Sequence, residues 1–300
     1  MNSRDNQPNF MVVGAAKSGT TSLCNYLAQH PQVFVTNPKE PHFFVKEKPI
    51  GKTVRTWEEY LELYDGAEKF QARGEGSVGY LYCWEEASAR IKEFLPSCKI
   101  IIILRNPIER AYSMYWHNVR DGRENLSFEE ALQAEEMRVR HCWEMSYHYT
   151  RLGFTAKAVE HYFGVFGRDN VHVVVYESFL KNMKQEMMQT FKFLGVDEYL
   201  ECDYKHLNKS GMPRNIWLHG FLNGAHTINK FVRGLTPMWF RIYVKQTIQP
   251  LNMKKAPEMN VETRDCLASL YEKDVHLLSC LLGCDLSGWL AHDLAGANNI

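Results

Sequence analysis

Hydrophobic residues gather in four short runs along this chain, separated by longer stretches of mixed polarity. The runs are Phe10–Gly14, Gln32–Thr36, Lys99–Leu104 and Val171–Tyr176. Lys99–Leu104 is the clearest of them, because its four consecutive isoleucines leave no polar face. Continuous β-branched runs are typical of parallel strands that are covered on both faces. We therefore predict four strands of a buried parallel sheet.

Between these runs, apolar residues recur every three or four positions, which is the period of an amphipathic helix. No repeat or low-complexity tract interrupts the order. Strands that alternate with helices favour an α/β fold, in which helices flank a central parallel sheet. The pattern predicts helices over Ser22–His30, Trp57–Tyr64, Glu85–Phe94, Pro107–Val119, Phe128–Arg138, Ala156–Phe166, Lys184–Leu194 and Val261–Leu282.

Composition narrows the class of protein. The 300 residues fit one large α/β domain or two average ones. Hydrophobic residues make up 45% and charged residues 23%, which is typical of a globular chain with a sizeable core. Lys and Arg number 35, and Asp and Glu also number 35. Nucleic-acid binding depends on excess positive charge, so we do not expect a nucleic-acid partner.

We expect this chain to work in the cytoplasm, without a membrane span. No window reaches the roughly 18 apolar residues that a spanning helix needs. The N-terminal sequence MNSRDNQPNF is polar and lacks the apolar core of a signal peptide. The eight cysteines are scattered and none forms a Cys-x-x-Cys pair. That pattern predicts reduced thiols, with neither a disulfide framework nor a zinc site.

One segment differs in composition from the rest of the chain. Residues 204–257 contain no Asp or Glu, nine Lys or Arg, and several interleaved aromatic residues. Such a segment can line a pocket for an anionic ligand or contact a membrane surface. It can equally be a basic solvated face over a local hydrophobic core. The composition leaves these alternatives open.

The sharpest motif is Gly14–Ser22 (GAAKSGTTS), which follows a predicted strand and opens a predicted helix. A helix N-terminus offers free N–H groups and the positive end of a dipole, and small residues let the backbone wrap an anion. The nucleoside-triphosphatase loop reads G-x-x-x-x-G-K-[ST]. Here Thr20 stands at the lysine position, and the lysine has moved to Lys17. This weakens an ATPase or kinase interpretation and favours one phosphate plus a transferred group.

A second motif begins where the isoleucine strand ends. Arg105 follows that strand directly, at the edge where open α/β sheets bind ligands. A guanidinium there can make a bidentate contact with a phosphate. Asn106, Pro107 and Glu109 fit the first positions of a helix, as capping residues. Ser113 lies seven residues after Asn106, two turns along the same helix face.

These motifs resemble the sulfotransferases that use 3′-phosphoadenosine 5′-phosphosulfate (PAPS), and most closely the branch of heparan sulfate and related bacterial enzymes. GAAKSGTTSL resembles their 5′-phosphosulfate loop, and RNPIERAYSMYWH resembles their 3′-phosphate segment. Pro38–Phe44 resembles the K-E-x-H-F-F segment with the catalytic glutamate. Further similarities are Gly74–Ser77 with Tyr80, Val175–Phe179, Phe193–Gly195, and His206–Gly211 with Arg214.

The resemblance implies a single sulfotransferase domain over residues 8–290, built on a P-loop-containing parallel sheet. Residues 215–257 would be a variable segment on the acceptor side. PAPS would be the donor co-substrate, no metal would be needed, and the product would be a sulfated hydroxyl or amine. We expect a small-molecule acceptor of the secondary-metabolite type, with a heparan-sulfate-type glycan as the alternative. One departure is Arg151–Phe154 (RLGF), where the family's R-G-x-Y supplies a tyrosine hydroxyl.

The resemblance also assigns roles. Lys17 would stabilise charge on the leaving phosphate, and Arg105 with Ser113 would bind the 3′-phosphate. The late loop at residues 209–214 would close over the donor. The full predicted donor site is Lys17, Ser18, Gly19, Thr20, Thr21, Ser22, Arg105, Ser113, Lys209, Ser210, Gly211 and Arg214.

Three residues are candidates for the general base. Glu40 comes first, because it follows a predicted strand at the ligand edge, and burial can raise a carboxylate pKa toward working pH. His42 is its rival, since an imidazole titrates near neutrality. His117 is the third, four residues past Ser113 on the same helix face.

Two other classes of protein compete with a sulfotransferase. A small-molecule kinase with a degenerate loop would bind ATP in a Mg²⁺-dependent manner. A non-catalytic nucleotide-binding or membrane-surface module would bind anionic lipid at low salt and transfer nothing. The shifted Lys17 together with Arg105 favours the sulfotransferase.

Overall fold

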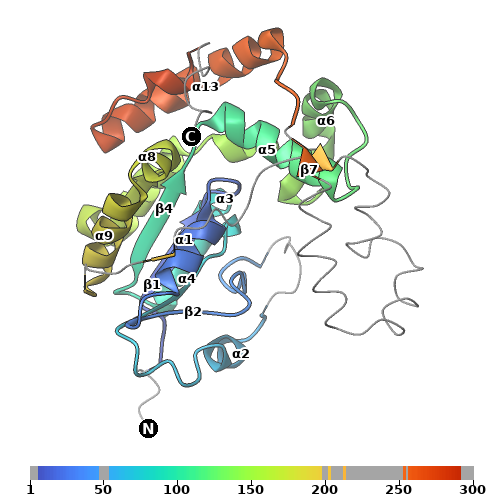
Figure 1. Cartoon of the computed structure of the whole chain (residues 1–300). Coiled ribbons are helices and arrows are strands. Elements are labelled where there is room, and N and C mark those ends of the chain that lie inside the picture. The colour runs from blue at the N-terminus through green and yellow to red at the C-terminus, as the bar shows by residue number, and fades with distance from the viewer. Residues whose placement is uncertain are drawn as a thin grey trace.

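The computed structural model describes residues 6–46, 54–197, 202–203, 212–213, 253–254 and 256–291. A five-stranded parallel sheet forms its centre, in the order β2-β3-β1-β4-β5 (Figure 1). A two-stranded antiparallel sheet pairs β6 with β7. The strands are β1 (Phe10–Gly14), β2 (Val33–Val35), β3 (Ala72–Glu75), β4 (Lys99–Leu104), β5 (Val171–Val175), β6 (Met212–Pro213) and β7 (Met253–Lys254).

The four predicted strands and the α/β class are confirmed, but the sequence analysis missed β3. Its sequence ARGE has two charged residues and a glycine, and no apolar run marks it. It is nevertheless an interior strand of the sheet, between β1 and β2. The predicted last strand is one residue too long, because Tyr176 already begins a helix.

Helices cover both faces of the sheet. Each predicted helix is present, although α1 begins at Thr20, two residues before the predicted start. The short helices α3 and α8 were not predicted. The α-helices are α1 (Thr20–Leu27), α2 (Trp57–Glu62), α3 (Gly79–Tyr82), α4 (Trp84–Phe94), α5 (Pro107–Arg120), α6 (Phe128–Arg140), α7 (Ala156–Phe166), α8 (Tyr176–Lys181), α9 (Met183–Leu194) and α13 (Val261–Leu282).

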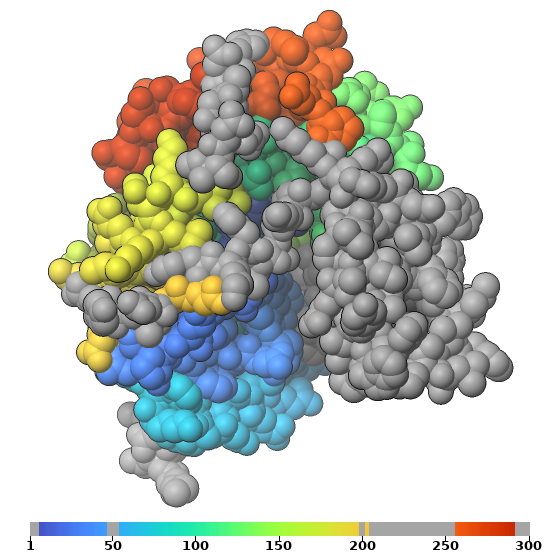
Figure 2. Space-filling view, in the orientation of Figure 1, coloured from blue at the N-terminus to red at the C-terminus, as the bar shows by residue number. Residues whose placement is uncertain are grey.

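Alternate residues of the central strands enter two separate cores, as a doubly covered sheet requires. One core receives Met11, Val13, Ile100 and Ile102, and helices α4, α5, α7 and α13 complete it. The other receives Phe10, Val12, Ile101 and Ile103, which α1 and α9 cover. In the space-filling view the N-terminal part (blue) lies beside α8 and α9 (yellow), and α13 (orange to red) lies at the top (Figure 2). The four isoleucines of β4 are therefore buried on both sides.

Helix α13 is tied to the start of α7 by the side chain of Asp274. Asp274 accepts the N–H of Thr155 at 3.0 Å and that of Ala156 at 3.3 Å. These groups begin α7, where an acidic side chain is favourable. None of the helices in the described ranges combines the length and hydrophobicity that a membrane crossing needs.

The strand order also fixes where a ligand can bind. The chain leaves β1 toward β2 and β3 on one side, and returns to β4 and β5 on the other. The loops after β1 and β4 thus diverge at the carboxyl edge of the sheet, leaving a crevice between them. Gly14–Ser22 and Arg105 both lie at that edge.

Candidate active site

The loop between β1 and α1 folds back tightly over the end of the sheet. Its Ala15 N–H donates to the carbonyl of Ile103 over 2.7 Å, which ties the loop to β4. Lys17 and Gly19 both have left-handed backbone, with φ of 66° and 92°. A Cβ at position 19 would lie 2.9 Å from the Tyr176 ring, so glycine is required there.

The N-terminus of α1 is open to an anion. Gly19 is its N-cap, no side chain caps it, and its first turn has no acidic residue. The first N–H groups of a helix have no acceptor within the helix, and they lie at the positive end of its dipole. The Ser18 hydroxyl is buried nearby and has no partner among the described residues. A phosphate or sulfate group bound at this helix N-terminus would accept hydrogen bonds from its free N–H groups.

Ser18 takes part in the fold of the loop itself. Its backbone N–H donates to the carbonyl of Ala15 at 3.3 Å. Ser18 is fully buried, so its hydroxyl lies behind the loop and its N–H closes the turn.

Arg105 connects the second motif to the loop. Its Nη1 donates to the carbonyl oxygen of Lys17 at 3.1 Å, and its guanidinium lies 5.0 Å from the centre of the Tyr176 ring. Asn106 caps α5 as predicted, because its side chain accepts the N–H groups of Ile108 and Glu109. The cap fixes the start of α5, and Ser113 then follows two turns later on the face toward the loop.

These elements enclose a cleft of about 350 Å³ at the carboxyl edge of the sheet, a size typical of small-ligand sites. The predicted residues Ser18 and His42 lie behind its lining. The predicted late loop at positions 209, 210, 211 and 214 lies outside the described residues, as does most of the 215–257 segment. The predicted residues that line the cleft are Lys17, Gly19, Thr20, Thr21, Ser22, Glu40, Arg105, Ser113 and His117.

Lys17 is the central cation of the cleft. Burial lowers the pKa of Lys17 from 10.5 to about 8, and repulsion from Arg120 and Arg105 adds to this effect. The ammonium is therefore mostly charged at neutral pH, yet poorly solvated and short of anionic partners. A charge in such a site interacts strongly with a bound anion.

Comparison with known proteins agrees with this geometry. A model of the sulfotransferase domain matches residues 7–218. The crystal structure of a sulfotransferase from Alicyclobacillus acidocaldarius superposes on this chain with a TM-score of 0.74 and 32% sequence identity. The superposition covers 95% of this chain and 99% of the Alicyclobacillus chain. The chain belongs to the sulfotransferase domain family. The α/β fold predicted with that family is likewise confirmed.

Curated relatives of this sulfotransferase are longer proteins. Human heparan sulfate glucosamine 3-O-sulfotransferase 3B1 is 27% identical over 207 residues, which is 69% of this chain and 51% of the relative. Mouse bifunctional heparan sulfate N-deacetylase/N-sulfotransferase 3 is 24% identical over 97% of this chain and 32% of its own length. The chain thus spans about a third to a half of these relatives.

Glu40 is not an isolated carboxylate, because each of its two oxygens has a polar partner. Its Oε1 lies 2.6 Å from Lys39 Nζ, and its Oε2 lies 3.2 Å from His42 Nε2. Burial raises the pKa of Glu40, but the hydrogen bonds from His42 and Lys39 outweigh it and hold the pKa below its ordinary value. The net shift is therefore downward, which the sequence could not show, because it did not reveal both partners. Glu40 is ionised at neutral pH.

His117 is held in a form that leaves it no free lone pair. Its Nδ1 accepts a hydrogen bond from Arg120 Nη2 at 2.5 Å, since a guanidinium can only donate. Burial, together with Lys17 and Arg120, lowers the pKa of His117 to about 3. The imidazole is thus neutral, with its proton on Nε2 near Asp121, and this arrangement disfavours it as a base.

Sequence reasoning missed two cations of the cleft, Arg120 and Arg123. Arg120 lies seven residues after Ser113, so the helical period could have placed it on the same face. Arg123 follows the end of α5, where no period applies. Asp121 binds both, through Arg120 Nε at 2.9 Å and Arg123 Nη2 at 3.5 Å. The positive charge of the cleft therefore extends beyond the residues that were predicted to bind the donor.

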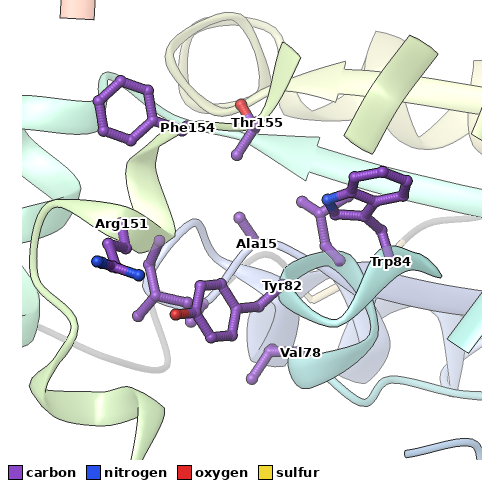
Figure 3. Close-up of a pocket in the computed structure, with 10 residues that line it drawn as sticks. Ala15, Val78, Tyr82, Trp84, Arg151, Phe154 and Thr155 are labelled. Atoms are coloured by element: carbon purple, nitrogen blue, oxygen red, sulfur yellow. The ribbon is translucent and has the colours of Figure 1, made fainter. Parts of the chain in front are cut away.

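A second cavity, of about 120 Å³, adjoins the cleft, and Ala16 and Val78 border both. Figure 3 shows the side chains of Tyr82, Trp84, Phe154 and Arg151 around it. Phe154 is 44% exposed, so its ring is available to a ligand. This is the residue at which the sequence departs from the family's R-G-x-Y pattern.

Two further observations concern metals and thiols. Within the described ranges of the sulfotransferase, no group of three or more His, Cys, Asp or Glu residues is arranged to hold a metal ion. None of the eight cysteines forms a disulfide.

Proposed function

We propose that this sulfotransferase moves a sulfuryl group from PAPS to a hydroxyl or amine of a small-molecule acceptor. The observation that carries the proposal is the convergence, in one cleft, of the uncapped α1 N-terminus, Lys17, Arg105 and Ser113. Two separated sites for anions match a donor with a 5′-phosphosulfate and a 3′-phosphate. PAPS supplies the activated sulfuryl group. The residues of this chain bind the donor, stabilise charge on the leaving phosphate and remove the acceptor's proton.

The donor is held by two groups of residues. The N–H groups and hydroxyls at Thr20–Ser22 bind the 5′ end, because the helix terminus attracts an anion. Arg105 and Ser113 bind the 3′-phosphate, which distinguishes PAPS from an ordinary nucleotide. Lys209, Ser210, Gly211 and Arg214 stay a prediction from the family resemblance.

Lys17 provides charge stabilisation. The leaving 5′-phosphate gains negative charge as the bond to sulfur breaks, and Lys17 is a fixed cation in a partly dry site. A preorganised charge of this kind acts on the transition state more than on the ground state.

Glu40 takes the acceptor's proton. It lines the cleft, whereas His42 is buried behind it and contacts Glu40. Glu40 is already ionised, which is the state that a general base requires. His42 then acts as a positioning residue, and acceptor binding displaces Lys39 or His42 from one carboxylate oxygen.

The second cavity supports a small acceptor. Its volume of about 120 Å³ suits a single ring-sized group and excludes a row of sugar rings. The flat faces of Tyr82, Trp84 and Phe154 suit an apolar or aromatic ring. Because Ala16 borders both cavities, a ring held there would present its hydroxyl beside Lys17.

A glycan acceptor is the second candidate, and Arg120 with Arg123 favours it. Both extend the positive cleft beyond the donor residues, and an anionic sugar chain could lie along them. The heparan sulfate enzymes among the relatives point the same way.

We also propose a reducing, cytoplasmic setting, which the lack of a disulfide at all eight cysteines supports.

Calorimetry tests the donor assignment. We expect 3′,5′-bisphosphoadenosine (PAP) to bind more tightly than AMP, and equal affinities would refute the two-anion site. ATP titrated with and without Mg²⁺ tests the kinase alternative. A labelled-PAPS assay against phenols, alkyl alcohols, amines and desulfated heparan oligosaccharides then decides the acceptor class, with mass detection of the added sulfuryl group.

A further inference from the structure

A buried carboxylate lies beneath the segment that carries Glu40, and the mechanism above does not use it. Glu75 ends β3 and is completely inaccessible to solvent. Its oxygens accept hydrogen bonds from the hydroxyls of Tyr60 at 3.0 Å, Tyr80 at 2.7 Å, and Ser77. Burying a carboxylate is costly, so this arrangement calls for a compensating role.

Two of the three hydroxyls also hold the backbone of residues 39–44, which we call the base loop. The His42 N–H donates to Ser77 Oγ at 3.1 Å, and the Phe44 N–H donates to the Tyr80 hydroxyl at 3.3 Å. Each hydroxyl therefore donates to Glu75 on one side and accepts from the base loop on the other. The Tyr60 hydroxyl donates to the same carboxylate and holds no N–H of the base loop.

The residue after Glu75 joins the base loop directly. Gly76 N–H donates to the carbonyl of Lys39 at 2.9 Å, and Lys39 Nζ donates to the carbonyl of Gly76 at 2.8 Å. A Cβ at position 76 would lie 2.5 Å from Cys24 Sγ, so the close packing of this residue against α1 depends on glycine. The segment from Glu75 to Tyr80 thus lies beneath the base loop and holds it through hydrogen bonds.

The base loop needs such support, because His42 has left-handed backbone with φ of 52°. A non-glycine residue adopts that conformation only where its surroundings fix it. We propose that Glu75 is a positioning residue: its carboxylate orients the Ser77 and Tyr80 hydroxyls, which hold the base loop so that Glu40 faces the cleft. The proposal rests on the proposed function only in taking Glu40 as the base.

The charge of Glu75 is what orients the hydroxyls. An ionised carboxylate only accepts, so both O–H groups point at it and leave their lone pairs to the two loop N–H groups. A glutamine would offer an NH₂ on one side, and one hydroxyl would have to turn away. Its loop N–H would then lose a well-aligned acceptor.

Hydrogen–deuterium exchange measured on peptides covering residues 39–46 tests the positioning. We expect Glu75→Gln and Tyr80→Phe to speed exchange in this segment at least about tenfold. Tyr60→Phe is the matched control, because it removes a hydroxyl from the same carboxylate and keeps the ring that packs against Phe43 and Phe44 of the base loop. It should leave exchange at 39–46 as in the wild type. Equal effects of Tyr80→Phe and Tyr60→Phe would overturn the proposal.

Turnover gives a second readout. Loosening the base loop should lower kcat of Glu75→Gln roughly 10- to 10²-fold, the larger figure being that for a catalytic group misplaced by about 1 Å. The Kd for PAP should not change, since Glu75 contacts no donor residue. An unchanged kcat in Glu75→Gln would contradict the proposal. If that variant fails to fold, the comparison of Tyr80→Phe with Tyr60→Phe decides.

The pH profile separates positioning from simple structural support. Burial raises the pKa of Glu75 to about 7, against the opposing hydrogen bonds of its three hydroxyl partners. Turnover should therefore fall as pH drops through about 7. This acidic limb of the pH profile should disappear in Glu75→Gln. It should persist in His42→Gln and in Tyr60→Phe. The groups that face Glu75 are Tyr60, Tyr64, Tyr80, His42, Cys24 and Cys98.

Among those neighbours, burial raises the pKa of each tyrosine and of both cysteines, which already lies above neutrality, even further above it. The Glu75→Gln and His42→Gln variants therefore test whether the acidic limb of the profile belongs to Glu75. A limb that survives in Glu75→Gln but is lost in His42→Gln would overturn the assignment. If the wild type transfers no sulfuryl group, the proposed function fails, while the exchange data still decide whether Glu75 positions the loop.

Discussion

Lys17 and Arg105 are both cations of the cleft, but we expect their removal to affect different steps. The drop in the pKa of Lys17 from 10.5 to about 8 corresponds to roughly 3 kcal/mol acting against its ammonium. A developing anion relieves that strain. Removing a fixed transition-state donor typically costs about 10²–10³ in kcat, which is of similar size. Lys17→Ala should therefore lower kcat by about that factor.

Arg105→Ala should act mainly on donor affinity. A hydrogen bond to a charged group is worth roughly 1.5–3 kcal/mol, so Kd for PAP should rise about 10- to 150-fold. Because Arg105 Nη1 also supports the Lys17 carbonyl, kcat should fall too, by less than in Lys17→Ala.

Steady-state kinetics at saturating PAPS, together with calorimetry of PAP, separate the two effects. Arg140→Ala is the matched control, since this arginine is on the surface of α6, with its side chain 74% exposed. It should change neither value. If Arg105→Ala lowered kcat at saturating donor more than Lys17→Ala, the role given to Lys17 would be wrong.

Three further outcomes follow from the site and its supports. Glu40→Gln should lower kcat at least about 10²-fold without changing PAP affinity, and unchanged turnover would move the base to His42. As pH rises through about 8, kcat/KM for PAPS should fall, because Lys17 loses its charge; a rise there would contradict this. Asn106→Ala should lower Tm by roughly 2–8 °C in calorimetry, because it removes the α5 cap and the hydrogen bond that Asn106 Nδ2 donates to the Trp289 carbonyl; an unchanged Tm would contradict this.

Most of the fold was accessible from the sequence because burial on two faces leaves a local signal. The four isoleucines of β4 do not alternate with polar residues, and this unbroken run predicted a strand that is buried on both faces. The helical period and the Asn106–Pro107 cap predicted the position of α5 correctly. Strand β3 carries no such signal. Its Arg73 and Glu75 are tolerated through contacts with residues distant in the chain, such as the Arg73 bond to Gln7 and the Tyr60 bond to Glu75.

The site could be predicted where it depends on a local motif, and not where it depends on pairing. The loop after β1 and Arg105 follow strands, so the sheet topology alone brings them together. The ionisation of Glu40 depends on Lys39 and His42 turning toward it, and that of His117 on Arg120. A sequence shows that such partners are near, but it does not show which atoms meet.

The two carboxylates of this region illustrate how surroundings divide the work of acid–base chemistry. Glu40 lies at the cleft wall, and hydrogen bonds from His42 and Lys39 keep its pKa low despite burial, so it stays ionised. Glu75 is fully buried among hydroxyls, and its pKa is raised to about 7. The more basic carboxylate cannot reach the acceptor, and the accessible one is the weaker base. On the proposal that Glu40 is the base, proton transfer to it becomes favourable only once the acceptor displaces a partner, which would couple acceptor binding to the chemical step.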